Sequence, residues 1–302
     1  MQQPLIFDIK RYAINDGPGI RLTIFFKGCP LSCAWCHNPE SISAKQQKLF
    51  TKSKCIGCGE CVKVCPLGAM TMTAVSPVTD PLKCQLCGEC AEVCPTRAIE
   101  MSGRHYQIAE LMEIVEKERP FFAQSEGGVT ISGGEPLLHP DYLLRLLRAC
   151  GEQHIHRAVD TSGFCSPEIL LEVAKHTDLF LYDLKMIDDG LHRRFTGVSN
   201  RRILDNLQLL AVSGAQITLR IPVIGGVNAD AGSASAIADF VAGLEGGARD
   251  VHLLPYHGVA AGKHLKLGGQ YDEGLMREPS TEELKRFGSC FAARGLGVVV
   301  GG

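Results

Sequence analysis

The sequence has almost no net charge, no long apolar run and no leader-like beginning. Its 302 residues carry 31 basic and 33 acidic side chains, so the formal net charge is -2. A chain without a basic excess is not expected to bind nucleic acid or a membrane surface. No apolar run reaches the roughly 18 residues that a membrane span requires, and residues 1–12 lack the basic and apolar parts of a signal peptide. We therefore expect a cytoplasmic protein.

Cysteine, in contrast, is abundant and clustered. Fourteen cysteines are present, and eleven of them lie between Cys29 and Cys94 in three short runs. In a secreted chain this would indicate disulfides, but without an export signal we favour metal binding. The length suits one large domain with an insert, or two domains. We expect residues 1–47 and 103–302 to form one domain that is interrupted by a cysteine-dense insert over 48–102.

From about residue 103 onward, predicted helices alternate with predicted strands. Short apolar runs predict strands at 22–26, 129–132, 157–161, 179–183, 217–221 and 251–254. Apolar residues at helical spacing predict helices that begin near residues 108, 140, 167, 203, 237 and 281. Strands that alternate with helices form parallel sheets. Because six strands are too few for a closed eight-stranded barrel, we expect an α/β fold, a partial (β/α)6 TIM-like barrel.

Polar residues recur where these predicted strands end. They are Gly133-Gly134-Glu135, Asp160-Thr161-Ser162-Gly163, Asp183-Leu184-Lys185, Arg220-Ile221-Pro222 and Pro255-Tyr256-His257. In α/β barrels the active site lies at the C-terminal ends of the strands. Any one of these groups could be an ordinary turn or capping residue, but together they predict one shared site.

Two of the cysteine runs repeat at an offset of 29 residues. They are Cys55-x2-Cys58-x2-Cys61-x3-Cys65-Pro66 and Cys84-x2-Cys87-x2-Cys90-x3-Cys94-Pro95. Each matches the bacterial ferredoxin run, in which the fourth cysteine ligates the other cluster. We therefore assign one 4Fe–4S cluster to Cys55, Cys58, Cys61 and Cys94, and a second to Cys84, Cys87, Cys90 and Cys65. Structural zinc is the alternative, but zinc prefers four ligands in pairs. The insert is thus predicted to be a ferredoxin-like domain.

The first run, Cys29-x3-Cys33-x2-Cys36, supplies only three ligands. A cubane cluster has four irons, so one iron would be left open. An open iron can bind a substrate, as the open position does in catalytic zinc sites. His37 is a conceivable fourth ligand, but its place directly beside Cys36 is geometrically awkward, and we favour a hydrogen-bonding or packing role for it.

The first run, with Trp35 before its last cysteine, resembles the radical S-adenosylmethionine (SAM) signature. Further segments are similar, in order and spacing, to the glycyl-radical-enzyme activating enzymes, and they cover essentially the whole chain. They are DGPGIR (16–21), CHNPE (36–40), SGGEP (132–136), DT (160–161), DLK (183–185) and LPYH (254–257). The ferredoxin-type insert is similar to the subgroup that activates dehydratases, decarboxylases and C–N or C–S lyases.

This resemblance implies three 4Fe–4S clusters, with the open iron of the first chelating the amino and carboxylate groups of SAM. Electron transfer into the sulfonium would yield methionine and a 5′-deoxyadenosyl radical, which would take hydrogen from a glycine of a partner glycyl-radical enzyme. The catalytic residues would be Cys29, Cys33, Cys36, Lys185 and His257.

The resemblance also implies binding roles for individual residues. Gly133, Gly134 and Glu135 would meet the SAM amino group, and Lys185 and Arg220 its carboxylate or nearby polar groups, as opposite charges pair. Trp35 and Asp160 would belong to the same site, with His257 near the adenosyl moiety. Asp160, Thr161 and Asp183 resemble a monovalent-cation site for Na⁺ or K⁺, and Asp16 a contact to the partner's C-terminal glycine loop. The alternatives are a barrel salt bridge for Lys185 and Arg220, and a capped turn for Asp160.

We expect a monomer that takes electrons from a flavodoxin or ferredoxin, with the two insert clusters relaying them. Two other functions fit parts of the sequence. A radical SAM enzyme that modifies a small molecule or peptide often holds auxiliary clusters in a C-terminal extension, but only Cys290 lies beyond Cys165. A pure electron carrier would leave roughly 200 residues of α/β sequence unexplained. Cys150, Cys165 and Cys290 fit no run, and we assign them no role.

Overall fold

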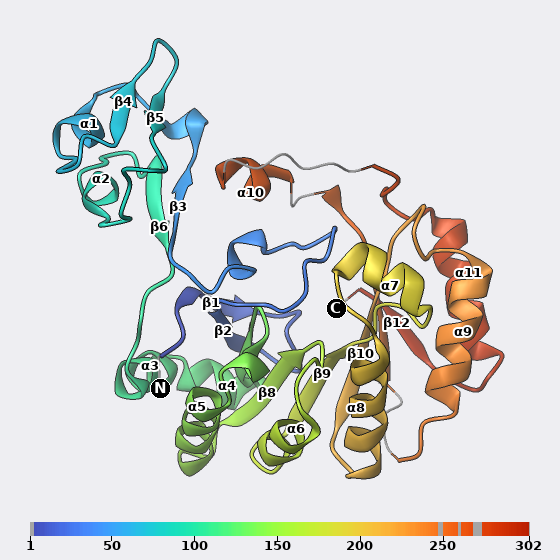
Figure 1. The fold of residues 1–302 in the computed structure, drawn as a ribbon. Coiled ribbons are helices and arrows are strands. Elements are labelled where there is room, and N and C mark those ends of the chain that lie inside the picture. The colour runs from blue at the N-terminus through green and yellow to red at the C-terminus, as the bar shows by residue number, and fades with distance from the viewer. Residues whose placement is uncertain (1–2, 247–249, 259–260, 268–273, 302) are drawn as a thin grey trace.

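The computed structural model describes residues 3–246, 250–258, 261–267 and 274–301. Its largest element is an eight-stranded sheet with the order β1–β2–β7–β8–β9–β10–β11–β12 (Figure 1). β1 (Ile6–Ala13) runs antiparallel to β2 (Arg21–Phe26), and every other pair of neighbours is parallel. The remaining strands are β7 (Gly128–Gly133), β8 (His156–Thr161), β9 (Leu179–Asp183), β10 (Ile217–Val223), β11 (Asp250–Pro255) and β12 (Val298–Val300).

The six predicted strands are present as β2 and β7–β11, and the prediction of an α/β fold with a mostly parallel sheet is confirmed. The sheet gains two edge strands that were not predicted. β1 is an edge strand in which most side chains are partly or fully exposed, so its sequence lacks an apolar run. β12 has only three residues, which is too short for a pattern to be recognised.

All six predicted helices form. They are α3 (Ile108–Lys117), α5 (Pro140–Glu152), α6 (Pro167–Ala174), α8 (Arg201–Val212), α9 (Ala231–Ala242) and α11 (Thr281–Ala292). The helix α11 begins with the expected capping box, in which Ser280 and Glu283 each accept from the other's backbone N–H. Three further helices, α4 (Arg119–Ser125), α7 (Asp189–Thr196) and α10 (Ala261–Lys266), are short and were not predicted.

The strands present one face to the helices and the other to the interior. In β11 the side chains of Val251 and Leu253 are buried in the main apolar core, while His252 and Leu254 between and beyond them line interior cavities. This alternation is the ordinary two-residue period of a strand. The interior face therefore offers side chains to a site within the curve of the sheet.

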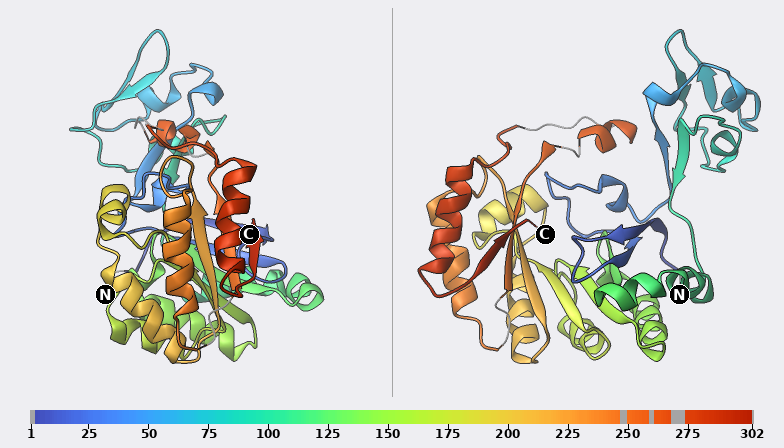
Figure 2. Two further views of the ribbon diagram at one scale, coloured as in Figure 1. Left: turned by 90° about the vertical axis from the view of Figure 1, so that its right-hand side faces the viewer. Right: turned by 180° about the vertical axis from the view of Figure 1, so that it is seen from behind.

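A cysteine-rich arm, residues 47–102, projects from this body (Figures 1 and 2). Its stem is the antiparallel pair of β3 (Gln47–Phe50) and β6 (Ile99–Ser102). Beyond the stem lie η2 (Lys52–Lys54), α1 (Glu60–Lys63), α2 (Glu89–Glu92) and the hairpin of β4 (Met70–Met72) with β5 (Pro77–Thr79). The expected insert boundaries, 48 and 102, fall within this stem, and its ferredoxin-like nature stays a prediction.

Hydrogen bonds from a buried lysine of the body hold the base of the arm in place. Lys27 follows β2, and its ammonium group donates hydrogen bonds to the Glu40 carbonyl and, at 2.9 Å, to Gln47 Oε1 at the base of the stem. Burial lowers the pKa of Lys27 to about 8, against the opposing effect of the Glu40 charge.

Within the described residues, no helix is long and apolar enough to span a membrane.

Candidate functional site

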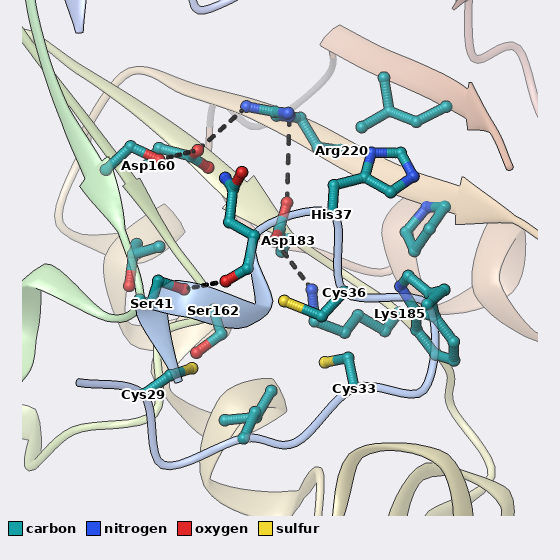
Figure 3. A pocket seen from close by; sticks show the side chains of 18 of the residues that line it. Cys29, Cys33, Cys36, His37, Ser41, Asp160, Ser162, Asp183, Lys185 and Arg220 are labelled. Atoms are coloured by element: carbon teal, nitrogen blue, oxygen red, sulfur yellow. Dashed lines mark hydrogen bonds and ion pairs between the residues drawn. The ribbon is translucent and has the colours of Figure 1, made fainter. Parts of the chain in front are cut away.

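A cavity of about 220 Å³ opens where six strands end, and Figure 3 shows it from close by. Side chains or backbone from the segments after β2, β7, β8, β9, β10 and β11 line it. They include Cys29, Cys33, Trp35, Cys36, His37, Asn38, Ser132, Gly133, Gly134, Asp160, Thr161, Ser162, Asp183, Lys185, Arg220, Pro222, Ile224, Leu254 and Tyr256. The structure thus brings most of the predicted site residues to one place.

The three cysteines of the first run lie on the loop that follows β2, and their sulfur atoms face a common space (Figure 3). The loop is fixed by backbone hydrogen bonds from Gly28 N to Ser41 O at 2.7 Å and from Cys36 N to Cys33 O at 3.0 Å. Burial raises the pKa of all three thiols, that of Cys36 to about 11. Their thiolates are therefore disfavoured unless a metal centre supplies positive charge.

Gly133, the last residue of β7, and Gly134 pack directly against the chain that leads into this loop. A Cβ on Gly134 would lie 2.1 Å from the carbonyl oxygen of Gly28, and one on Gly133 would lie 2.2 Å from that of Phe26. Gly133 also has a φ of 120°, which side chains other than hydrogen rarely allow. The glycine pair is required because the β7 segment touches the backbone leading into the cysteine loop.

Two acid–base pairs occupy the interior face. Lys185 Nζ lies 2.8 Å from Asp183 Oδ2, and Arg220 lies 3.2 Å from Asp160 Oδ2 and 4.0 Å from Asp183 Oδ1. Ser132 also donates to Asp160 Oδ2 at 2.6 Å. Burial raises the pKa of Asp160 to about 6, with Arg220 opposing the shift. Burial disfavours the charge of Lys185, but Asp183 and Cys33 outweigh it, so the pKa of Lys185 is raised.

The side chain of Glu135 is absent from the cavity lining, and its expected contact with a ligand amino group stays a prediction. Its fully buried carboxylate accepts hydrogen bonds from Thr161 Oγ1 at 2.6 Å, Ser162 Oγ at 2.6 Å, Ser162 N at 2.9 Å and Leu137 N at 3.2 Å. Because these donors occupy both oxygens, the side chain ties the end of β8 to the segment after β7. The structure indicates a positioning role.

One end of the cavity is aromatic and apolar. Trp35 and Tyr256 are buried with Ile224 in a small cluster, and the ring of His37 lies 6.4 Å from that of Tyr256. Burial lowers the pKa of His37, as do nearby cationic groups. This contact is of the kind expected from a packing role for His37, which was favoured over a role as a metal ligand.

His257 lies outside the cavity lining, and its expected place near an adenosyl moiety stays a prediction. Its side chain is 58% exposed, is absent from the cavity lining and lies 3.3 Å from Glu278 Oε1. The preceding residue, Tyr256, lines the cavity instead. In this structure the LPYH segment therefore contributes its tyrosine and not its histidine.

A second cavity, of about 450 Å³, lies at the opposite ends of the same strands. Its lining runs from Ile14–Pro18 to the starts of β8, β9, β10 and β11, and Arg220 lines both cavities. Asp16 is in this loop, where its Oδ2 accepts from Thr23 at 2.7 Å and its carbonyl accepts from Thr130 at 2.6 Å. Asp16 thus lies beside the second cavity, and its charge acts on Asp160 and Arg220 of the first.

The eight cysteines of the arm line two small cavities. One is lined by Cys65, Cys84, Cys87 and Cys90, and the other by Cys55, Cys58, Cys61 and Cys94. The two groups are the sets that the repeat predicts. Ala69 N and Ala98 N donate at 3.2 Å to the sulfurs of Cys65 and Cys94, the fourth cysteines of their runs. Across the described ranges, no three His, Cys, Asp or Glu side chains converge closely enough to hold a single metal ion.

Several residues that line the cavity had no individual role assigned from the sequence. Ser132, Ser162 and Tyr256 belong to the recognised strand-end groups and motifs, so the motifs located the site but did not single out each side chain. Asn38 is also in the lining, and it accepts a hydrogen bond at 2.6 Å from Lys263 of α10. Lys263 pairs with Glu40 as well, at 2.9 Å, and no sequence signal links these distant positions.

Comparison with known proteins gives a consistent result. Residues 23–232 match the family model described as Radical SAM superfamily. The chain is 41% identical to the trans-4-hydroxy-L-proline dehydratase activating enzyme of Clostridioides difficile, over 99% of each protein. It is 38% identical to the choline trimethylamine-lyase activating enzyme of Oleidesulfovibrio alaskensis, over 96% of this chain and 95% of that protein.

A solved structure is also similar. A domain of the pyruvate-formate lyase-activating enzyme from Bacteroides vulgatus has 38% identity and a TM-score of 0.51. The match covers 58% of this chain and 99% of that domain.

Proposed function

Because the chain belongs to the radical SAM superfamily, and within it to the enzymes that activate glycyl-radical enzymes, we propose that the cavity at the strand ends is where it generates the activating radical. The enzyme cleaves SAM reductively to methionine and a 5′-deoxyadenosyl radical, which takes a hydrogen atom from a glycine of its partner. The observation that carries this placement is the convergence of Cys29, Cys33 and Cys36 on a cavity lined by acid–base pairs.

The residues of the cysteine loop fit a 4Fe–4S cluster. Three sulfurs face one space, and their burial makes a cationic metal centre the natural means of keeping them ionised. Bound there by Cys29, Cys33 and Cys36, the cluster would supply one electron and an open iron position. The protein's part is to hold the cysteines in place, through the backbone bonds of the loop and its contact with Gly134.

The charged lining suits the amino-acid part of SAM. A zwitterion presents one ammonium and one carboxylate, and the cavity offers the bases Lys185 and Arg220 beside the acids Asp160 and Asp183. We propose that Lys185 and Arg220 meet the carboxylate. The ammonium group is then left to the backbone at Gly133 and Gly134 and to the acids, since Glu135 is used elsewhere.

The aromatic end suits the adenine ring. Trp35 and Tyr256 offer flat, buried surfaces, His37 adds an exposed ring at the same end, and Ile224 adds an apolar wall. Base stacking on aromatic side chains is favourable by about 1–3 kcal/mol. We therefore propose that Tyr256 takes the adenosyl-binding role that the sequence assigned to His257.

The binding of a monovalent cation by Asp160, Thr161 and Asp183 stays a prediction, and it depends on which oxygens of these residues are available. The hydroxyl of Thr161 donates to Glu135, and Asp160 Oδ2 is shared between Ser132 and Arg220. A cation that binds Asp160 would compete with Arg220 for the same oxygen. Binding of Na⁺ or K⁺ would therefore have to be coupled to a movement of Arg220.

The partner's glycine loop would reach the interior beside Asp16. The second cavity adjoins Gly17 and Pro18 and shares Arg220 with the first, so it offers a route to the site. Asp16 is held by Thr23 and by Thr130, which fixes the loop around it. Trans-4-hydroxy-L-proline dehydratase and choline trimethylamine-lyase, named by the relatives, are the first partners to test.

We propose that the arm carries two 4Fe–4S clusters in a ferredoxin-like domain. The support is the sorting of eight cysteines into the two sets that the repeat requires, around separate cavities. Backbone N–H groups donated to Cys65 and Cys94 would stabilise these sulfurs as thiolates. A flavodoxin or ferredoxin donor and a monomeric state also stay predictions.

Electron paramagnetic resonance tests the proposed function. The reconstituted, reduced protein is mixed anaerobically with SAM and each candidate partner, and the expected result is a SAM-dependent glycyl doublet. Cys33→Ala should abolish the doublet, whereas Cys290→Ala, the same change at a partly buried cysteine outside the runs, should retain it. Formation of 5′-deoxyadenosine without a doublet in any partner would contradict the partner assignment, and absence of both products would contradict the site.

A further inference from the structure

The two halves of the cysteine-rich arm carry opposite charge. At the repeat offset of 29 residues, segment 51–64 corresponds to segment 80–93. The first has three lysines and one acidic residue, and the second has one lysine and three acidic residues. Lys54 and Lys83 occupy equivalent positions, but Lys63 is replaced by Glu92 and Thr51 by Asp80. Two similar folds therefore present a basic face in one half and an acidic face in the other.

The basic half lies farther from the barrel. Lys48 and Met101, paired in the stem, line the cavity of Cys65, Cys84, Cys87 and Cys90, which we call the proximal cavity. The cavity of Cys55, Cys58, Cys61 and Cys94, the distal cavity, is lined instead by Ala98 and Ile99. Because β6 runs toward the body, Ile99 is the residue farther out along the stem. Figure 1 accordingly shows α1 farther from the main sheet than α2.

The distal surface also exposes apolar side chains beside a ligand cysteine. Ile56 lies between Cys55 and Cys58 and is 67% exposed, and Cys58 is itself exposed. Val75, in the turn between β4 and β5, is 67% exposed. Lys52 and Lys54 precede Cys55 and are exposed as well. The proximal half also exposes apolar groups and a ligand cysteine, Leu82 at 96% and Cys87, so it is the charge that distinguishes the two halves. Redox encounters use small surfaces of either kind.

We propose that this distal surface, formed by Lys52, Lys54, Ile56, Cys58 and Lys63, is the docking site of an acidic protein that carries one electron. The proposal rests on the proposed function, which needs a one-electron reductant. In each encounter the carrier is oxidised by one electron and the enzyme is reduced by one, with no atom transferred. The charge asymmetry supports this occupant, because the lysines attract an acidic carrier while the acidic half beside the barrel repels it.

The order of the two arm cavities explains why an electron carrier would dock at the outer end of the arm. An electron that enters at the distal cavity has the proximal cavity between it and the barrel, and Lys27 ties the base of the stem to the loop of Cys29. Entry at the outer end leaves the barrel's two cavities free for SAM and for the partner's glycine loop. The carrier and the glycyl-radical enzyme would then dock at separate surfaces.

Reduction kinetics provide the test. The holoenzyme is mixed with reduced flavodoxin in a stopped-flow spectrometer, and the second-order rate of enzyme reduction is measured at several salt concentrations. For Lys52→Glu/Lys54→Glu we expect a rate lower by about tenfold or more at low salt and a weaker salt dependence. Lys54→Glu alone should also lower the rate, and Lys83→Glu is its matched control, because Lys83 is equivalent to Lys54 in the acidic half and the charge change is the same; Lys83→Glu should stay within about twofold of the wild type.

Two further measurements separate docking from other causes. Calorimetry with oxidised flavodoxin should show weaker binding by the double variant, a readout that does not depend on catalysis. With dithionite as the reductant, the variant should cleave SAM and activate the partner at the wild-type rate, which shows that its fold and clusters are intact. If the dithionite-reduced wild type activated no partner, the proposed function would fail while the flavodoxin kinetics still tested the docking site.

Three results would overturn the docking proposal. One is a wild-type rate of flavodoxin reduction in the double variant, and another is an equal loss in Lys83→Glu. The third is a raised KM for the glycyl-radical enzyme with an unchanged flavodoxin rate, which would assign the surface to the partner enzyme instead.

Discussion

Replacing Glu135 by glutamine distinguishes a residue that binds SAM from one that holds the site together. Glu135 Oε1 accepts from Thr161 Oγ1 and Leu137 N, and Oε2 accepts from both N and Oγ of Ser162. Glutamine keeps the size of the side chain but replaces one acceptor oxygen with an amide group that only donates. Either orientation of the amide therefore faces donors that have lost their acceptor.

The magnitude follows from the number of donors affected. If the amide replaces Oε2, the hydroxyl of Ser162 can rotate, but its backbone N–H, which lies 2.9 Å from Oε2, stays buried without a partner. An unsatisfied buried donor costs about 1–3 kcal/mol, and hydrogen bonds to a charged group contribute about 1.5–3 kcal/mol. We expect the free energy of unfolding to fall by about 2–4 kcal/mol, which corresponds to a Tm lower by roughly 5 °C or more.

Thermal unfolding followed by circular dichroism and SAM binding by calorimetry measure the two effects separately. Glu168→Gln is the control, since Glu168 lies on α6 at the surface and should leave both quantities unchanged. Thr161→Val should be destabilising too, and its effect should add incompletely to that of Glu135→Gln because the two residues share a hydrogen bond. A wild-type Tm combined with tenfold weaker SAM binding in Glu135→Gln would refute the positioning role.

Three further predictions concern acidity, packing and capping. Burial raises the pKa of Asp160 from 3.8 to about 6 despite the charge of Arg220. The folded state therefore takes up this proton first, and the resulting stabilisation, present at low pH, is lost as pH rises through about 6. Calorimetry across pH 5–7 should show a SAM affinity that changes with pH in the wild type and not in Asp160→Asn. A variant that keeps the wild-type pH dependence would contradict the assignment to Asp160. Gly134→Ala should abolish SAM binding in the same assay, because its Cβ would lie 2.1 Å from the carbonyl oxygen of Gly28. Wild-type affinity in this variant would show instead that the backbone shifts to accommodate the methyl group. Ser280→Ala should lower the free energy of unfolding in urea by about 1 kcal/mol through loss of the α11 cap, with glycyl-radical formation unaffected.

The predictable parts of the fold are those with strong periodicity. The central strands and the six predicted helices bury one face each, and burial imposes a pattern that the sequence displays. Edge strand β1 is largely exposed and carries no such pattern, and α7 is short and polar, with its N-cap supplied by Asp188. The cysteine sets of the arm were predictable for a different reason, because chain connectivity limits which sulfurs can surround one cavity.

The motifs located the site, and alternation along a strand then limits which side chains reach it. In β10 and the segment after it, Thr218, Arg220, Pro222 and Ile224 line the two cavities in succession, every second residue. In β11, His252, Leu254 and Tyr256 follow the same period, but Pro255 also lines the cavity, because the period no longer holds where a strand ends.

Two predicted side chains lie outside the cavity lining in this structure. At the end of β7, Ser132, Gly133 and Gly134 line the cavity, and the side chain of Glu135 turns toward Thr161 and Ser162. At the end of β11, Tyr256 lines the cavity and the side chain of His257 is at the surface. Strand parity, counted from the buried residues of each strand, was available in the sequence. It is a physical constraint on function, because a side chain on the wrong face of a strand cannot contact a ligand in the interior, whatever motif contains it.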